Sequence, residues 1–165
     1  MDHSVYLALG SNLGKREENL RLARESLSPK VRVLNVSPVY ETPPWGYLDQ
    51  PDFLNQVLEG ETRLAPKELL IYLKQIEARM GREKTVRNGP RVIDLDLLFY
   101  DDLILEDPNG DYPLSLPHPR MAGRAFVLVP LSKLAPDLVH PVSGKTIREM
   151  LAETDIEGIH PYPES

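Results

Sequence analysis

The alternation of apolar and polar side chains divides the first third of the chain into segments of strand or helix period. Val5, Leu7 and Leu9 alternate with Tyr6 and Ala8, which predicts a strand that ends at Gly10. Leucines and an alanine at helical spacing predict a helix over residues 15–27, which Ser28-Pro29 stops. A run rich in β-branched residues predicts a second strand over residues 31–40.

The same pattern continues after a proline-rich loop at residues 42–46. Residues 53–62 predict a third strand, and Pro66 opens a second helix whose apolar stripe reaches Met80, with Gly81 as its cap. A strongly apolar run that ends at Tyr100 predicts a fourth strand. Beyond it we expect a hairpin around residues 108–110 and short helices near residues 124–134 and 146–151.

The order strand, helix, strand, strand, helix, strand is typical of one α+β architecture. It predicts a ferredoxin-like antiparallel sheet with helices packed on one face. The length of 165 residues fits one domain, so we expect residues 1–165 to form a single domain.

Two carboxylates interrupt the fourth strand. Because side chains alternate along a strand, Asp94 and Asp96 should share one face, with Cα atoms about 7 Å apart, while Leu95, Leu97 and Phe99 point the other way. Neighbouring carboxylates repel each other and lose hydration on a half-buried strand, so a cation would stabilise them. Oxygen ligands suit Mg²⁺ or Mn²⁺. A solvated face of an antiparallel sheet is the alternative interpretation of the same triplet.

Cationic residues crowd the segment before this strand: Arg82, Lys84, Arg87 and Arg91. Arginine matches phosphate oxygens with its planar fork, and Mg²⁺ commonly binds through one or two carboxylates plus substrate phosphates. The combination favours a polyphosphate ligand over an isolated metal site.

The composition of the chain limits the classes of partner that we expect it to bind. The net charge of −6 should repel nucleic acid and anionic membranes, so an anionic ligand must be held by a local cluster of cations. The absence of cysteine excludes thiol catalysis and disulfide scaffolds and is compatible with a reducing compartment. The sequence also shows neither a secretory signal nor an apolar run long enough to cross a bilayer. We therefore expect a cytoplasmic protein with no nucleic-acid or membrane partner.

At this point an ordered set of motifs resembles one family. The motifs are Ala8-Leu9-Gly10-Ser11-Asn12-Leu13-Gly14, Tyr40-Glu41-Thr42-Pro43-Pro44, Asp49 to Asn55, Gly81-Arg82, Gly89 to Asp96, Leu116 to Met121 and Arg124-Ala125-Phe126. Their order along nearly the whole chain is similar to that of 6-hydroxymethyl-7,8-dihydropterin pyrophosphokinases. Those folate-pathway enzymes transfer a diphosphate group from ATP to a pterin alcohol and release AMP.

The resemblance implies a magnesium and ATP half of the site. It assigns two Mg²⁺ ions to Asp94 and Asp96, which bridge the ATP phosphates, and it gives a catalytic role to these aspartates together with Arg82 and Arg91. It also implies ATP contacts from Glu77, Arg82, Arg91, Leu97, His118 and Arg124. Read from the residues alone, Glu77 could equally face solvent and pair with Lys74.

The resemblance also implies a pterin half. Thr42, Pro43 and Trp45 would supply backbone and wall contacts, Asn55 would bond the edge of the ring, and Phe53 and Phe126 would stack on its faces. A flat heterocycle with a donor and acceptor edge suits such an aromatic sandwich. Without the resemblance, either phenylalanine is more typical of a core residue than of a ligand contact.

Two other functions fit part of the pattern. Another Mg²⁺-dependent phosphoryl-transfer or nucleotide-hydrolysing enzyme on the same fold would use the same aspartates and arginines but not the pterin residues. A non-catalytic RNA-binding module of ferredoxin-like fold would carry exposed aromatics and lysines on its central strands, where this chain carries paired aspartates. By resemblance we expect a monomer that uses ATP and the pterin as substrates.

Overall fold

The computed structural model describes residues 2–44, 49–81 and 92–163. Its helices are α1 (Arg16–Leu27), α2 (Pro66–Arg79), α3 (Ala125–Leu134) and α4 (Ile147–Ala152). Its strands are β1 (His3–Ser11), β2 (Val31–Val36), β3 (Tyr40–Thr42), β4 (Phe53–Thr62), β5 (Asp94–Tyr100), β6 (Leu105–Asp107), β7 (Leu114–Leu116) and β8 (His160–Pro161). The predicted elements are all present, with boundaries that differ by a few residues at most of them.

The main sheet has the order β5-β1-β4-β3-β8 among the described strands, and β2 also pairs with β4. Every pairing is antiparallel. Strand β1 therefore lies between β5 and β4, which are the last and the third of the four strands predicted for the core. The split arrangement of two β-α-β units requires this order. The structure confirms the α+β ferredoxin-like fold.

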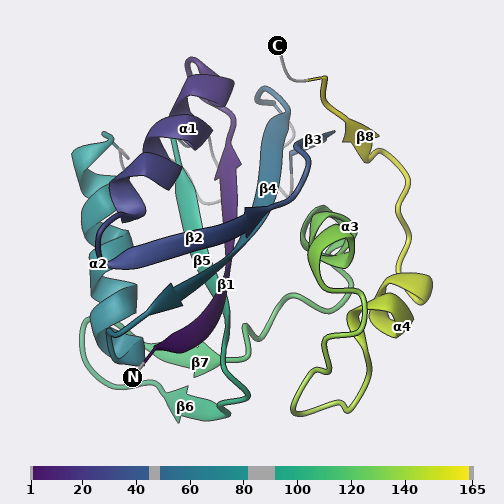
Figure 1. Cartoon of the computed structure of the whole chain (residues 1–165). Coiled ribbons are helices and arrows are strands. Elements are labelled where there is room, and N and C mark those ends of the chain that lie inside the picture. The colour runs from purple at the N-terminus through teal and green to yellow at the C-terminus, as the bar shows by residue number, and fades with distance from the viewer. Residues whose placement is uncertain (1, 45–48, 82–91, 164–165) are drawn as a thin grey trace.

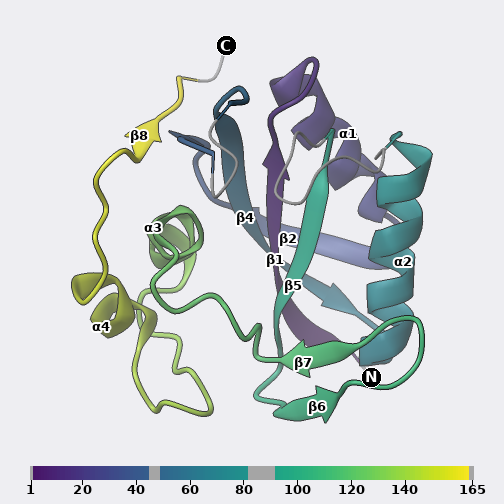
Figure 2. The ribbon, with the colours of Figure 1, turned by 180° about the vertical axis from the view of Figure 1, so that it is seen from behind.

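Helices α1 and α2 pack side by side on one face of this sheet, on the left in Figure 1 and on the right in Figure 2. Their buried stripes, with Leu20 and Leu27 on α1 and Leu69 and Leu73 on α2, meet the inward side chains of β1 and β5 in one hydrophobic cluster. Pro66 stands at the start of α2, as predicted, where its missing N–H has no helical partner to lose.

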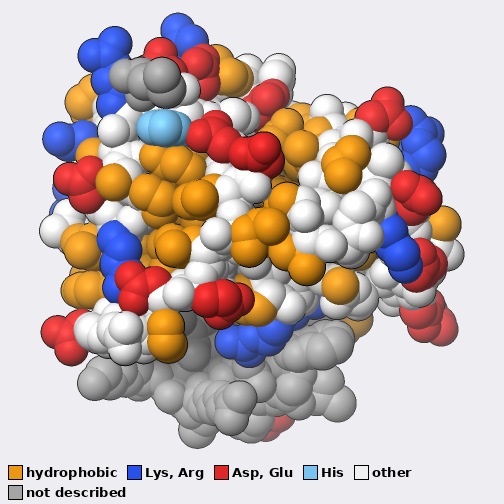
Figure 3. Space-filling view, turned by 90° about the horizontal axis from the view of Figure 1, so that it is seen from below, with side chains coloured by type: hydrophobic (Ala, Val, Ile, Leu, Met, Phe, Trp, Pro, Cys, Tyr) orange, Lys and Arg blue, Asp and Glu red, His pale blue; other side chains and the backbone are white. Residues whose placement is uncertain are grey.

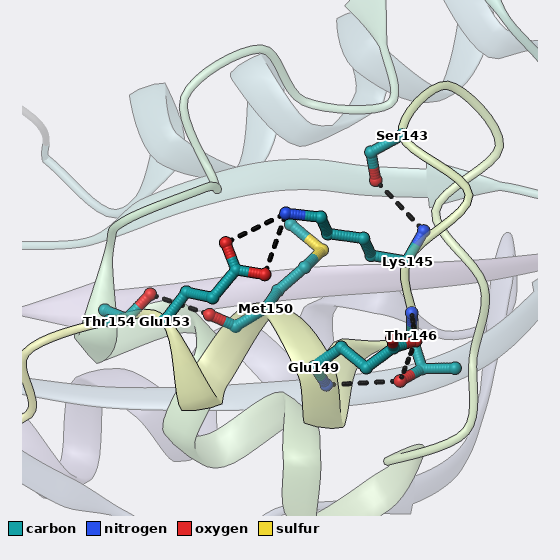
Figure 4. A network of polar contacts seen from close by, with 7 residues as sticks. All are labelled: Ser143, Lys145, Thr146, Glu149, Met150, Glu153 and Thr154. Carbon is teal, nitrogen blue, oxygen red and sulfur yellow. Dashed lines mark hydrogen bonds and ion pairs between the residues drawn. The ribbon is translucent and has the colours of Figure 1, made fainter.

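The opposite face of the sheet is covered by α3 and α4, an arrangement that the expectation of helices on one face did not include (Figure 1). A second hydrophobic cluster joins these helices to β1, β4 and β5, and it contains Tyr6, Val57 and Leu128. The helix α4 begins with a capping box, in which Thr146 and Glu149 satisfy each other's backbone N–H groups (Figure 4). Two helical layers thus enclose the sheet.

The predicted strand over residues 31–40 is divided into β2 and β3. The residues between them include Pro38, which has no N–H to donate to a ladder. The hydroxyl of Ser37 accepts the N–H of Val57 at 3.0 Å, and the Ser37 N–H donates to the Val57 carbonyl at 2.8 Å. The chain therefore stays beside β4 across the interruption. In β3, Thr42 then pairs with Phe53 of β4.

Figure 3 shows the molecule from below the view of Figure 1, and hydrophobic side chains gather near the centre of this face. Strands β6 and β7 form a separate two-stranded antiparallel sheet. The exposed hydrophobic residues in this part of the chain are Leu103, Ile104 and Tyr112. Across the described residues, no helix combines the length and apolar character that crossing a membrane would need.

Candidate active site

The two aspartates of β5 lie where the sequence predicts them. In the ladder between β1 and β5, Asp94 is opposite Gly10 and Asp96 is opposite Ala8, so both carboxylates share the face that α3 covers. Both side chains are half-buried. The arrangement is neither a fully solvated sheet face nor a closed core.

One residue expected to point away from them does not. A register shift places Phe99 opposite Tyr6 and Leu97 opposite Leu7, so Leu98 is an extra residue on β5. Leu95 and Leu97 pack toward α1 and α2 as predicted, whereas Phe99 packs in the cluster on the aspartate side of the sheet. The prediction for Phe99 was wrong because a bulge changes the alternation.

A row of cross-strand neighbours connects the aspartates to Asn55, one of the residues expected from the sequence to bind the pterin. Gly10 pairs with Asp94 on one side and with Asn55 on the other. A Cβ at Gly10 would lie 3.1 Å from Asn55 Oδ1 and 3.5 Å from Phe53 Cδ1. Gly10 is itself buried, and its missing side chain allows Asn55 and Phe53 to approach β1 this closely.

Asn55 is held in a defined orientation. It is 7% exposed, and its Nδ2 donates to Thr42 Oγ1 at 2.7 Å. Phe53 pairs with Thr42 across β3 and β4 and is half-buried, while Pro43 is exposed beyond the end of β3. The structure therefore brings together Thr42, Phe53 and Asn55.

His118 and Arg124 approach the same face from the segment that leads into α3. The His118 N–H donates to the Leu98 carbonyl at 2.9 Å, which fixes this segment beside β5. Burial lowers the pKa of His118 below its ordinary value, against the opposing charge of Asp96 and together with that of Arg124. Its Nδ1 accepts the Arg120 N–H at 3.2 Å, so the neutral ring carries its proton on Nε2.

Arg124 is the N-cap residue of α3 and is half-buried. Burial and the neighbouring Arg120 lower its pKa, while Asp96 opposes the shift. Its Cζ lies 5.4 Å from the centre of the Phe126 ring, within cation–π distance. Arg124 thus supplies positive charge near Asp96 in a chain whose net charge is negative.

Glu77 does not face solvent. It is 2% exposed, and its Oε2 accepts the Leu95 N–H at 2.8 Å while its Oε1 lies 3.4 Å from Lys74 Nζ. The exposed alternative for Glu77 was wrong, although the pairing with Lys74 is present. The carboxylate holds the backbone between Asp94 and Asp96 from behind the sheet, a role that the sequence did not indicate.

Leu97 is 3% exposed and belongs to the cluster beneath α1 and α2. Its side chain therefore cannot line a nucleotide site, and a contact with ATP would have to use its main chain. Trp45, Arg82 and Arg91 lie outside the described residues. The sequence also indicated no role for Arg16 or Asn12, whose contacts with β3 and with the residues just before β4 are visible only in three dimensions.

The donor set fits a hard divalent cation that shares its coordination with a ligand. Over residues 2–44, 49–81 and 92–163, no group of three or more histidine, cysteine, aspartate or glutamate side chains could hold a metal ion. Two half-buried carboxylates alone leave most positions of an octahedral ion open. Phosphate oxygens and water are the natural ligands for those positions.

Comparisons with known proteins agree with this geometry. The family described as 7,8-dihydro-6-hydroxymethylpterin-pyrophosphokinase matches residues 6–136. A protein of Methylorubrum extorquens named 2-amino-4-hydroxy-6-hydroxymethyldihydropteridine pyrophosphokinase is 47% identical over 157 residues, which is 94% of this chain and 96% of that protein. The folic acid synthesis protein fol1 of Schizosaccharomyces pombe is 45% identical over 160 residues, 96% of this chain, but this chain spans only 21% of its length.

Solved structures agree in fold. A Plasmodium falciparum HPPK-DHPS crystal structure superimposes with a TM-score of 0.77 at 16% identity, covering 93% of this chain and 45% of that one. Since the family match extends over residues 6–136, most of the chain, the chain belongs to the 7,8-dihydro-6-hydroxymethylpterin-pyrophosphokinase family.

Proposed function

We propose that this protein transfers a diphosphate group from ATP to the hydroxymethyl oxygen of 6-hydroxymethyl-7,8-dihydropterin and releases AMP, a step of folate biosynthesis. The observation that carries the proposal is the row Asp94–Gly10–Asn55 across three adjacent strands. It places carboxylates suited to a metal-bound triphosphate beside an amide suited to the edge of a heterocycle. A nucleotide hydrolase would need only the first of these.

On the ATP side, Asp94 and Asp96 would hold two Mg²⁺ ions. Bound there, the ions would neutralise phosphate charge and polarise the phosphate oxygens. His118 and Arg124 would contact the triphosphate, and the Leu97 main chain would contact the nucleotide. Arg82 and Arg91 complete the proposed set on the strength of the resemblance alone.

Glu77 has a different place in this proposal. With its carboxylate already bonded to the Leu95 N–H, it would act by holding β5 in position and so orienting the two aspartates. We therefore replace the direct ATP contact expected from the sequence by an indirect one.

On the pterin side, Asn55 would bond the polar edge of the ring, with Thr42 fixing the amide plane. Phe53 from β4 and Phe126 from α3 would stack on the two faces of the ring, and Pro43 and Trp45 would form the wall. Phe53 and Phe126 are both half-buried, which leaves part of each side chain accessible to a ligand.

The reaction depends on positioning of the substrates and on charge stabilisation more than on covalent catalysis by the protein. The hydroxymethyl oxygen attacks the β-phosphorus, the bond between that phosphorus and the oxygen bridging to the α-phosphate breaks, and AMP leaves with the electron pair. The net reaction releases one proton from the hydroxyl group. Arg124 and the metal ions would stabilise the charge that develops on the phosphate oxygens.

The test is the nucleotide product. With ATP and Mg²⁺, AMP should form only when 6-hydroxymethyl-7,8-dihydropterin is present, in equal amount to the pterin diphosphate. Formation of ADP and phosphate, or of AMP without the pterin, would refute the proposal. Chelation of divalent cations with EDTA should stop the reaction, and continued turnover would exclude the metal.

Two finer points belong to the same proposal. Titration with Mn²⁺ in the presence of α,β-methylene-ATP should show two ions bound per chain, and a single ion would contradict the assigned stoichiometry. Sedimentation should show a monomer, as the resemblance to the family implies, and a dimer would contradict this part of the proposal. We keep the expected cytoplasmic location in the proposal because ATP is available in that compartment.

A further inference from the structure

Arg16, in the first turn of α1, lies behind the pterin-side residues and not among them. Its Nη1 donates to Glu41 Oε2 at 2.7 Å and to the Asp52 carbonyl at 2.9 Å. Glu41 is the central residue of β3, and Asp52 directly precedes β4. One guanidinium group therefore ties the adjacent ends of two strands to one helix.

These strand ends carry the pterin-side residues on their other face. Because side chains alternate along a strand, Glu41 points to α1 while its neighbour Thr42 points to the opposite face. Thr42 pairs with Phe53 and bonds the Asn55 amide. A shift of either strand end would displace all three of these side chains together.

Asn12 supports the same strand ends from the turn after β1. It is 1% exposed, and its Nδ2 donates to Gln50 Oε1 at 2.7 Å and to the Pro51 carbonyl at 3.0 Å. Asn12 thus holds Gln50 and Pro51, and Arg16 at the start of α1 holds the next residue, Asp52. The Arg16 guanidinium also lies 5.7 Å from the ring centre of Tyr162, which adjoins β8 and donates its N–H to the Val39 carbonyl at 2.9 Å.

The environment of Arg16 differs from that of Arg21 on the same helix. The side chains of Arg16 and Glu41 are 24% and 35% exposed, so solvent screens this pair only in part. Both bonds come from one nitrogen, Nη1, which the planar guanidinium group holds in a fixed orientation, whereas a lysine ammonium group on its flexible stem is less well fixed. Arg21, by contrast, is 46% exposed and pairs only with Glu18 and Glu25 of its own helix in the contacts that the structure describes.

We propose that Arg16 is a positioning residue for pterin binding: it fixes β3 and the start of β4 from the back of the sheet, and thereby places Thr42, Phe53 and Asn55. The inference rests on the proposed function for its substrate. Arg16 itself does not touch the pterin.

The test compares Arg16→Met with Arg21→Met, which removes the same charge from the same helix. Initial rates are measured with the pterin varied at saturating ATP and Mg²⁺, and then with ATP varied at saturating pterin. In Arg16→Met the KM for the pterin should rise about tenfold. A misplacement of about 1 Å can cost about 10²-fold in rate, so the tenfold rise corresponds to a smaller shift of the strand ends. The KM for ATP should change less than about twofold, because Asp94 and Asp96 stand on a strand that Arg16 does not contact.

Arg21→Met should leave both constants unchanged, and Arg16→Lys should give a pterin KM between those of the wild type and Arg16→Met. Equal increases in both KM values, or a lower melting temperature with unchanged kinetics, would overturn the inference, because a merely structural role predicts one or the other.

A second measurement keeps the inference separate from the proposed function. Amide hydrogen exchange of residues 53–55 should be faster in Arg16→Met than in Arg21→Met, whatever the substrate is. Equal protection in the two variants would refute the positioning role. Failure of the wild-type protein to form AMP with the pterin would instead refute the proposed function.

Discussion

Replacement of Gly10 by alanine tests the spatial relation between the two halves of the site. Gly10 stands between Asp94 and Asn55 on adjacent strands. A Cβ there would lie 3.1 Å from Asn55 Oδ1, a distance tighter than most real contacts of this kind. The amide would have to move by a few tenths of an ångström, yet its Nδ2 is already bonded to Thr42 Oγ1 at 2.7 Å.

The size of the effect depends on the hydrogen bonding that the displaced amide would lose. A neutral hydrogen bond contributes about 0.5 to 1.5 kcal/mol, and a tenfold change in affinity corresponds to about 1.4 kcal/mol. Displacement of Asn55 should therefore raise the KM for the pterin roughly two- to tenfold. The free energy of unfolding should change by less than about 1 kcal/mol, because a glycine-to-alanine change also restricts the unfolded chain.

Gly60→Ala supplies the matched control. Its Cβ would lie 3.0 Å from the Arg32 carbonyl oxygen and 3.0 Å from Val31 Cγ1, at the other end of β4. Because a backbone atom cannot move aside as a side chain can, this variant should lose about 1 to 3 kcal/mol of stability. The folded Gly60→Ala protein should keep the wild-type KM for both substrates.

The assay is steady-state AMP formation for each variant, with melting temperatures measured in parallel. The reasoning predicts opposite outcomes for the two glycines: altered pterin KM with little change in stability for Gly10→Ala, and altered stability with unchanged KM for Gly60→Ala. A Gly10→Ala enzyme with wild-type pterin KM would show that the space above Gly10 is not part of the pterin site. A rise in the KM for ATP alone would assign that space to the nucleotide.

Three further changes have defined outcomes. Asp96→Asn should lower turnover by at least about 10²-fold without lowering the melting temperature. The control, Asp102→Asn at an exposed position, should not alter turnover. Equal activity of the two variants would exclude Asp96 from the site. Burial lowers the pKa of His140 below its ordinary 6.5, so the folded state disfavours the protonated ring. The stability that is present above pH 6.5 should therefore be lost as the pH falls below that value. In denaturation experiments between pH 7 and pH 5, His140→Gln should lose less stability than the wild type, and an equal loss would contradict this prediction. Burial raises the pKa of Tyr6 from 10.0 to about 12, so stability present below pH 10 should be lost as the pH rises toward 12; Tyr6→Phe should lack this alkaline loss, and a wild-type alkaline profile would count against it.

The periodicity of the chain was enough to predict the core of the fold. The strands and helices that build the split β-α-β arrangement have long apolar patterns, clear stops at Ser28-Pro29 and Gly81, and a proline at the start of α2. Such local signals need no knowledge of distant residues. The positions of α3 and α4 on the far face could not be derived in this way, because periodicity identifies a helix but not the surface that it packs against.

Local irregularities limited the prediction of side-chain direction. The alternation that correctly placed Asp94 and Asp96 on one face failed at Phe99, because one extra residue in the ladder reverses the faces of the residues after it. The division of residues 31–40 at Pro38 had a visible signal, since proline cannot continue a ladder within a sheet. The bulge at Leu98 had none, because its sequence is uniformly apolar.

Burial of a charged residue was equally hidden in the sequence. Glu77 and Lys74 have the spacing of an ordinary exposed ion pair on a helix, and only the proximity of the Leu95 N–H shows why the carboxylate lies inside. A buried carboxylate is stabilised when it accepts hydrogen bonds, and here one of them comes from the strand that carries the aspartates. Sequence spacing within α2 contains no information on that contact.

Glu77 and Arg16 together suggest why both helices of the back layer matter to a site on the front. The first holds β5 through the Leu95 N–H, and the second holds β3 and the start of β4 through Glu41 and the Asp52 carbonyl. β1 lies between these strands and contributes Gly10, which has no side chain to separate the two halves. Each half is therefore anchored by a different helix, while their spacing is set by the hydrogen-bonded ladders of the sheet. Because a closely packed sheet deforms little, a change behind one half should alter the affinity for one substrate and leave the other nearly unaffected.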